Sequence, residues 1–270
     1  MSDLTPEQQT LKEAYVKARG YWRPCTEGLL RLDPGFLQTY GKYAGYAAEN
    51  GPLSRKMCEL IYVALDGSAT HLFRSGLALH LRLALDEGAT AREIVDVFRL
   101  ATAQGLEGCH VGIGILAEEL VEAGLQVDHS ELTKEQQKLR DTYIAQFADW
   151  PDFCELWLRR DPGYFAALLD LLAGGRAGDG LDGRSQCLIS IALNACFTAL
   201  NPQGLRMHIK RALRLGIDQR EILQVLQMTA HLGVHACAVG VPVLMEALDE
   251  RAANAKAAAE SMGSGEGGRQ

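Results

Sequence analysis

Two histidines stand at equivalent places in two closely similar segments of the sequence. The stretch GLALHLRLALDEGATAREI, residues 76–94, contains His80, and the stretch GLRMHIKRALRLGIDQREI, residues 204–222, contains His208. The pKa of an unperturbed imidazole lies close to neutrality, so a histidine can donate or accept a proton at physiological pH. The two histidines are therefore the first candidates for acid–base chemistry.

A second group of histidines has a spacing that can chelate a metal ion. His231 and His235 are four residues apart in TAHLGVHACAVG, which places them on one face of a helix. His208 could supply the third ligand of such a site. Histidines at this spacing also face substrates or pack in a core, so the sequence leaves these alternatives open.

Further polar residues near these histidines could contact a substrate. The positions that correspond to the second histidine group in the first half of the chain include Glu107, with His110 close by. Arg74 and Arg206 precede the two paired histidines, and a guanidinium can bind a carboxylate through two parallel hydrogen bonds. We expect these four residues, together with His231 and His235, to be candidates for substrate binding.

These residues recur because one unit is present twice in the chain. The stretch TPEQQTLKEAYVKARGYW from Thr5 aligns without a gap with TKEQQKLRDTYIAQFADW from Thr133, a shift of 128 residues. A period above a hundred residues indicates two copies of a complete domain and not a solenoid. The sequence predicts a first repeat over residues 1–130, a second over 131–256 and a disordered tail over 257–270.

The apolar residues of both repeats recur at helical spacing. Leu77, Leu81 and Leu85 are typical, and no Val/Ile-rich run alternates with period two. Ser54 and Thr90 stand where an N-cap is expected before apolar helices. The fold class predicted from this pattern is all-α.

Composition excludes several classes of protein. Of the 270 residues, 47% are hydrophobic and 23% are charged, and no uninterrupted apolar run approaches the length of a membrane span. The N-terminus has no export signal, and the seven cysteines include no Cys-x-x-Cys pair, so we expect a cytoplasmic protein. The formal net charge of −7 is unfavourable for binding nucleic acid.

The sequence resembles the carboxymuconolactone decarboxylase family, which shares its all-α fold with the AhpD-type alkylhydroperoxidases. The resemblance is carried by LSRKMCELIYVALDGSATHLFRSGLALHLRLALDEGATAREIVDVFRLATAQGLEGCHVGI and, more closely, by ALNPQGLRMHIKRALRLGIDQREILQVLQMTAHLGVHACAVGV. The pattern is a Glu-Leu-Ile, a histidine followed by Ala-Leu and a glycine, and then Glu-Ile. The resemblance implies a tandem duplication of an AhpD-like helical domain.

The resemblance also assigns an acid–base pair. Its residues fall on Glu59 and His80 in the first repeat and on Cys187 and His208 in the second, which has therefore lost the carboxylate. The catalytic residues expected on this basis are Glu59, His80 and His208. Neither histidine follows a Cys-x-x-Cys, so peroxidase chemistry of the AhpD type is disfavoured.

The predicted function is that of a lyase that needs no cofactor and acts on a small carboxylated lactone or ring-cleavage product of aromatic catabolism. One alternative is a metal-dependent decarboxylase or hydrolase that uses His208, His231 and His235. Another is a ligand-binding or assembly module without catalysis. Family members commonly form symmetric rings, so we expect a homo-oligomer, with three fused chains replacing six subunits.

Overall fold

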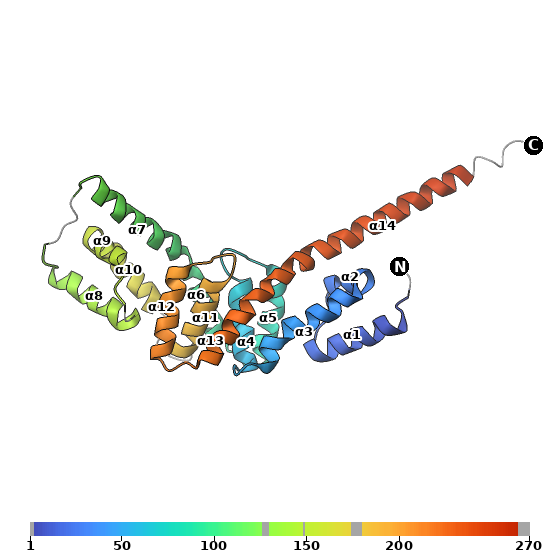
Figure 1. The fold of residues 1–270 in the computed structure, drawn as a ribbon, viewed down its shortest axis with the longest axis horizontal. Helices are drawn as coiled ribbons and strands as arrows, with labels where there is room; N and C mark the ends of the chain where they lie inside the picture. The colour runs from blue at the N-terminus through green and yellow to red at the C-terminus, as the bar shows by residue number, and fades with distance from the viewer. Residues whose placement is uncertain (1–2, 126–129, 148, 174–179, 264–270) are drawn as a thin grey trace, which may run out of the picture. The chain divides into compact units, whose positions relative to one another are not determined.

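Helices joined by short loops, without any strand, make up the residues that this computed structural model describes, which are 3–125, 130–147, 149–173 and 180–263 (Figure 1). The first repeat forms α1 (Pro6–Arg19), α2 (Pro24–Leu32), α3 (Pro34–Asn50), α4 (Arg55–Asp66), α5 (Arg74–Asp86), α6 (Ala91–Ala103) and α7 (Gly105–Glu122). The second forms α8 (Lys134–Phe147), α9 (Asp152–Arg160), α10 (Pro162–Ala173), α11 (Gly183–Ala195), α12 (Pro202–Arg214), α13 (Gln219–Thr229), η1 (Ala230–Val234) and α14 (His235–Gly263). The all-α prediction is confirmed.

The order of helices repeats with the sequence. Helices α5 and α12 begin at positions that correspond under the repeat shift, as do α6 and α13. The predicted caps are present: the Ser54 hydroxyl accepts from the Met57 amide, and Thr90 forms a capping box with Glu93. The same local signals therefore start and stop equivalent helices in both repeats.

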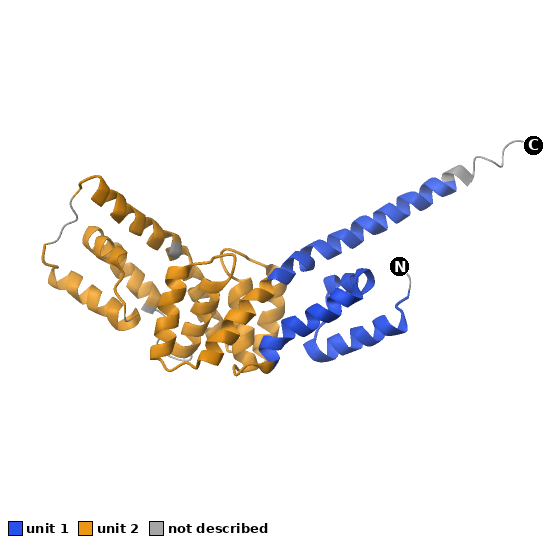
Figure 2. Cartoon of the chain, in the orientation of Figure 1, with its two compact units in different colours: residues 1–49, 233–270 blue, residues 50–232 orange. Residues whose placement is uncertain are grey.

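The two compact units of the structure do not coincide with the two repeats (Figure 2). One unit consists of residues 1–49 and 233–270, and the other of residues 50–232. In the first unit α14 of the second repeat packs on α2 of the first repeat, and in the second unit α7 packs on α9. Each unit thus combines helices of both repeats. The boundary near residue 130 remains a prediction that concerns the two sequence repeats and not the two compact units.

Helices α4 and α11 form the centre of the unit made by residues 50–232. They contact each other, and α11 also contacts α6 and α13. Nearly every side chain of α4 from Met57 onward is buried, as is the corresponding stretch of α11. Each fully buried Leu or Ile contributes about 1.5–3 kcal/mol of hydrophobic stabilisation. This pair of apolar helices therefore forms the core from which the candidate site residues project.

Two buried hydrogen bonds join the repeats in a reciprocal way. The Leu53 amide of the first repeat donates to Gln224 Oε1 of the second at 2.8 Å, and the Leu181 amide of the second donates to Asp96 Oδ2 of the first at 3.0 Å. Leu53 corresponds to Leu181 under the repeat shift, and Asp96 to Gln224. Each repeat therefore satisfies a buried amide of the other.

Equivalent threonines meet between the repeats. The hydroxyls of Thr70 and Thr198, which are 128 residues apart, are hydrogen-bonded to each other at 3.0 Å. Residues that are equivalent by repeat touch each other only at a two-fold axis. The unit of residues 50–232 therefore has the internal pseudo-symmetry of a fused dimer.

Helix α14 continues to Gly263, through the first part of the segment 257–270 that was predicted to be a disordered tail. The segment AANAKAAAESM is rich in alanine, the strongest helix former, and Lys256 lies 3.9 Å from Glu260 one turn later. Residues 264–270 lie outside the described residues. Local helix propensity thus extends α14 well past the end of the repeat.

One helical stretch is long and apolar enough to cross a membrane by length and composition. It runs over Gln219–Glu260, where an 18-residue window reaches a mean hydropathy of 1.5. The sequence was expected to lack a run of this length, because histidines interrupt the Ala, Gly, Val and Cys residues of the window. Core and interface helices of non-membrane proteins satisfy the same criterion, so the finding by itself is weak.

The cluster between α7 and α9 contains a half-buried histidine. The His110 ring stacks on Phe153 at 4.7 Å and meets Trp157 edge-on at 5.6 Å. Burial lowers the pKa of His110 from 6.5 to about 4. The imidazole is therefore neutral in the folded protein near pH 7.

Replacing Gln224 with alanine tests the reciprocal bonds. We expect Gln224→Ala to lower the free energy of unfolding by about 1–3 kcal/mol, because the buried Leu53 amide loses its acceptor. Gln227→Ala, an exposed change in the same helix, is the control and should stay within about 0.5 kcal/mol. Urea denaturation measures both, and equal effects for the two variants would contradict the assigned role.

Acid titration tests the half-buried His110. Its pKa is lower in the folded than in the unfolded protein, so the unfolded state binds more protons and stability falls as pH falls from about 6.5 towards 4. In His110→Phe, which preserves the aromatic stack, this loss should be smaller by about 1.4 kcal/mol per pH unit in that range. Denaturant titrations at several pH values measure the slopes, and identical slopes would contradict the prediction.

Candidate functional site

Glu59 and His80 form a close pair in the first repeat. Glu59 lies in α4 and His80 in α5, and Oε2 of the carboxylate is 2.7 Å from Nδ1 of the imidazole. Only 14% of the Glu59 side chain and 7% of the His80 side chain are exposed. A hydrogen bond of this length fixes the orientation of both side chains. The structure therefore brings together the two residues that the resemblance paired.

Tyr62 and His231 complete the surroundings of this pair. The Tyr62 ring, one turn along α4 from Glu59, lies 4.7 Å from the His80 ring and 5.2 Å from the His231 ring. Tyr62 is buried, so it covers the imidazole with an aromatic surface. The sequence did not single out Tyr62, although its position three residues after Glu59 on the same helix was a usable signal. Both repeats contribute to this site, because His231 belongs to the second.

The corresponding place in the second repeat has no acid–base pair. The Cys187 thiol donates to the backbone carbonyl of His208 at 3.2 Å. His208 is 8% exposed, and its Nδ1 has no hydrogen-bond partner among the described residues. Burial, and secondarily the Arg211 charge, lower the pKa of His208 to about 3. His208, expected to be catalytic, thus lacks the carboxylate that a proton-transfer pair requires.

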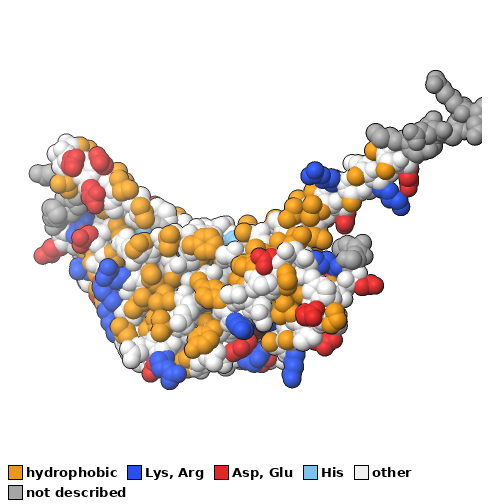
Figure 3. All heavy atoms as spheres, turned by 45° about the vertical axis from the view of Figure 1, so that its right-hand side comes forward, with side chains coloured by type: hydrophobic (Ala, Val, Ile, Leu, Met, Phe, Trp, Pro, Cys, Tyr) orange, Lys and Arg blue, Asp and Glu red, His pale blue; other side chains and the backbone are white. Residues whose placement is uncertain are grey.

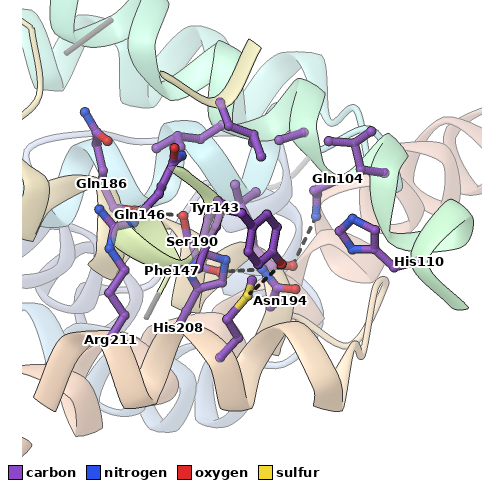
Figure 4. A pocket seen from close by; sticks show the side chains of 16 residues that line it. Gln104, His110, Tyr143, Gln146, Phe147, Gln186, Ser190, Asn194, His208 and Arg211 are labelled. Carbon is purple, nitrogen blue, oxygen red and sulfur yellow. Dashed lines mark hydrogen bonds between the residues drawn. The ribbon is translucent and has the colours of Figure 1, made fainter. Parts of the chain in front are cut away.

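A cavity of about 60 Å³ lies beside His208 (Figure 4). Its apolar wall consists of leucines, Met207, Phe147 and the Tyr143 ring. No Asp or Glu is among the described residues that line it. Its polar wall consists mainly of Gln104, Gln186, Ser190, Asn194, His208 and Arg211. The second repeat therefore has an open pocket, although it has lost the acid–base pair.

Most polar groups of the cavity are already hydrogen-bonded to the protein. Gln186 Nε2 donates to the Leu181 carbonyl at 2.8 Å, and Ser190 Oγ donates to the Gln186 carbonyl at 2.8 Å. Asn194 donates to the Ser190 carbonyl and accepts from Asn201, each at 2.8 Å. These bonds hold the polar wall in place and leave it little unused capacity to donate.

The two arginines predicted to hold a carboxylate do not line the cavity. Arg74 and Arg206 are both exposed. The cationic residue of the cavity is instead the half-buried Arg211, one turn after His208 on α12. Arg74 and Arg206 were predicted because they precede the histidines. Residues three apart on a helix lie on the same face, so Arg211 shares a face with His208. Helical periodicity was the signal that could have found Arg211.

The remaining predicted residues are distributed over different places. His110 lines the cavity of the second repeat, whereas His231 lies beside Tyr62. His235 lies in α14, and the side chain of Glu107 is outside the described part of α7. Within residues 50–232, as far as they are described, no group of three potential metal ligands contains His208 or His231. The structure thus gives the metal alternative no assembled ligand set within this unit.

Comparison with known proteins identifies the family. The model of the carboxymuconolactone decarboxylase family matches residues 34–106, in the repeat that keeps Glu59. A crystal structure from Burkholderia xenovorans LB400, of a protein provisionally assigned as a gamma-carboxymuconolactone decarboxylase subunit, is 32% identical. The match covers 91% of this chain and 99% of that one, with a TM-score of 0.84. No curated protein matches the sequence. The chain belongs to the carboxymuconolactone decarboxylase family.

Proposed function

We propose that the protein is a lyase that decarboxylates or isomerises a small carboxylated lactone or ring-cleavage product of aromatic catabolism without a cofactor. The observation that carries the proposal is the 2.7 Å contact between Glu59 and His80. Membership of the family supports a decarboxylase-type role. The nature of the substrate and the assignment of the catalytic pair are the parts that experiment must test.

The pair divides the tasks of acid–base catalysis between its two members. Because Glu59 accepts the hydrogen bond from Nδ1–H of His80, the other ring nitrogen, Nε2, is left to exchange a proton with substrate. The carboxylate also stabilises the protonated imidazole electrostatically. Glu59 is therefore proposed to be the orienting group and His80 the proton donor.

In the proposed decarboxylation, the carbon that loses CO₂ takes up one proton. The bond between the ring carbon and the departing carboxylate breaks, CO₂ leaves, and the electron pair passes into the conjugated lactone carbonyl as an enolate. His80, as imidazolium, then gives its Nε2 proton to carbon, and solvent restores that proton. Burial of the pair favours loss of CO₂, because low polarity strengthens the interaction of the developing enolate with the imidazolium.

The assembly of the chain is also a proposal. In α7, Val111, Ile115 and Leu116 are exposed, and in α14 the residues at the equivalent positions, Val239, Val243 and Leu244, are exposed as well. Figure 3 shows hydrophobic side chains on the surface of α14. Apolar side chains that recur in the same register on both terminal helices support contacts with further copies. We propose a cytoplasmic trimer equivalent to a six-subunit ring, without nucleic acid or membrane partners.

Substitution of the pair tests the proposed catalysis. We expect Glu59→Gln and His80→Ala each to lower kcat/KM by about 10²–10⁴-fold, the usual contribution of a general acid–base group. Turnover is followed as CO₂ release or loss of ultraviolet absorbance on carboxylated lactones. Glu87→Gln, which changes a more exposed glutamate beside α5, is the matched control and should retain full activity.

The competing functions predict different results. A metal-dependent enzyme would contain about one metal ion per chain by plasma mass spectrometry after purification without chelator, and chelation would abolish its activity. A module without catalysis would turn over none of the lactones, and Glu59→Gln would change nothing. Full activity of Glu59→Gln in an active enzyme would contradict the assignment of the pair.

A charge on α7 tests the proposed assembly. We expect the native protein to have the mass of a trimer in light scattering, and Ile115→Glu to lower that mass because a charge would be buried in the contact. Glu118→Gln changes an exposed polar residue of the same helix and should leave the mass unchanged. A monomeric native protein, or an unchanged Ile115→Glu, would contradict the proposal.

A further inference from the structure

The cavity of the second repeat differs from the first site in the charge it presents. Arg211 corresponds under the repeat shift to Leu83, so only the second repeat places a guanidinium on this face. Conversely, Glu59 corresponds to Cys187, so only the first repeat has the carboxylate. The site of the first repeat therefore carries a negatively charged group, and the cavity of the second repeat carries a positively charged one.

Arg211 is the cationic group of the cavity with unused capacity to donate. It is half-buried, and within the described residues it makes no hydrogen bond or ion pair. Gln104, Gln186, Ser190 and Asn194 are hydrogen-bonded to the protein, and Gln146 is a further, uncharged amide on this wall. A partly buried guanidinium without a carboxylate partner favours an anionic ligand.

The described residues that line the cavity carry one positive charge, that of Arg211. Its two histidines, His110 and His208, are neutral near pH 7, because burial lowers the pKa of each well below its usual value. No acidic side chain lines the described wall. A ligand that neutralises the cavity therefore carries a single negative charge.

The second observation that points to a ligand is the unpartnered His208 nitrogen. His208 lines the cavity, and its buried Nδ1 is without a hydrogen-bond partner in the described structure. Its twin His80 makes that bond to a carboxylate. A buried polar atom left unpaired costs free energy that a bound ligand can recover.

Size and polarity restrict the ligand further. A water molecule needs about 10–15 Å³ measured in this way, so about 60 Å³ accommodates roughly four to six non-hydrogen atoms. The wall opposite the polar side chains consists of leucines, Met207 and Phe147. The ligand therefore combines one carboxylate with a short apolar body.

We infer that the second repeat contains a binding site for a short-chain monocarboxylate, in which Arg211 holds the carboxylate, His208 is its hydrogen-bonding neighbour and the leucine-rich wall holds the hydrocarbon. Ser190 keeps the space open where the first repeat has Tyr62. This site goes beyond the proposed function, because it requires no turnover and shares none of the proposed catalytic residues.

Calorimetric titration of the full chain with sodium propionate at constant ionic strength tests the inference. We expect saturable binding of one propionate per chain. Propionamide has nearly the same shape without the charge and should not bind, and succinate, which is larger and doubly charged, should bind more weakly. No binding of propionate, or equal binding of propionamide or succinate, would overturn the inference.

Variants locate the site. Arg211→Gln should weaken propionate binding about tenfold or more, because a charged hydrogen bond is lost. Arg206→Gln, a matched loss of charge on the exposed face of α12, should bind like the native protein. Equal weakening in both variants, or none in Arg211→Gln, would show that Arg211 does not hold the ligand.

A change of volume provides a test that does not depend on charge. Ser190→Tyr introduces the residue that the first repeat has at this position and should abolish propionate binding by filling the cavity. Circular dichroism checks that each variant is folded. Arg211→Lys, which keeps the charge, should bind propionate more weakly than the native protein, and it replaces Arg211→Gln in the test if that variant does not fold. Undiminished binding by a folded Ser190→Tyr would overturn the location. Because binding is measured without substrate, the result is independent of any lyase activity.

Discussion

The structure depends on a reciprocal exchange of buried hydrogen bonds between the repeats. Asp96 and Gln224, at equivalent positions in α6 and α13, each accept from a backbone amide of the other repeat. Neither bond can form within one repeat alone, since each requires a side chain from one copy and a loop from the other. The exchange holds α4 against α11, and these two helices carry Glu59 and Tyr62 on one side and Ser190 and Asn194 on the other. The repeats are thus interdependent, and each candidate site is positioned by contacts from both.

Much of the fold could be predicted from the sequence. Helix boundaries depend on local signals, such as the Ser54 cap, and these recur in both repeats. The Glu59–His80 pair also followed from a pattern, because the spacing within one family places these residues on adjacent helices. The reciprocal bonds could not be predicted, since their partners are 171 and 85 residues apart and no local pattern links them.

Two features of the structure do not follow from nearness in sequence. Arg74 and Arg206 stand close to the histidines along the chain, but both side chains are exposed, and Arg211 lines the cavity beside His208. Helix α14 continues to Gly263 because its alanines favour the helix. Helical phase decides the first feature, and intrinsic helix propensity decides the second.

The meeting of Thr70 and Thr198 places the parts of the two repeats within residues 50–232 around a pseudo-two-fold axis. In a dimer of identical subunits, a substitution in one site appears at once in the other, so a carboxylate and a guanidinium could not be assigned to separate sites. Covalent fusion removes that restriction. It also fixes the stoichiometry: every chain that contributes one Glu59–His80 pair contributes one Arg211 cavity. The ratio of the two kinds of site is therefore encoded in the gene, whatever the number of chains in the assembly.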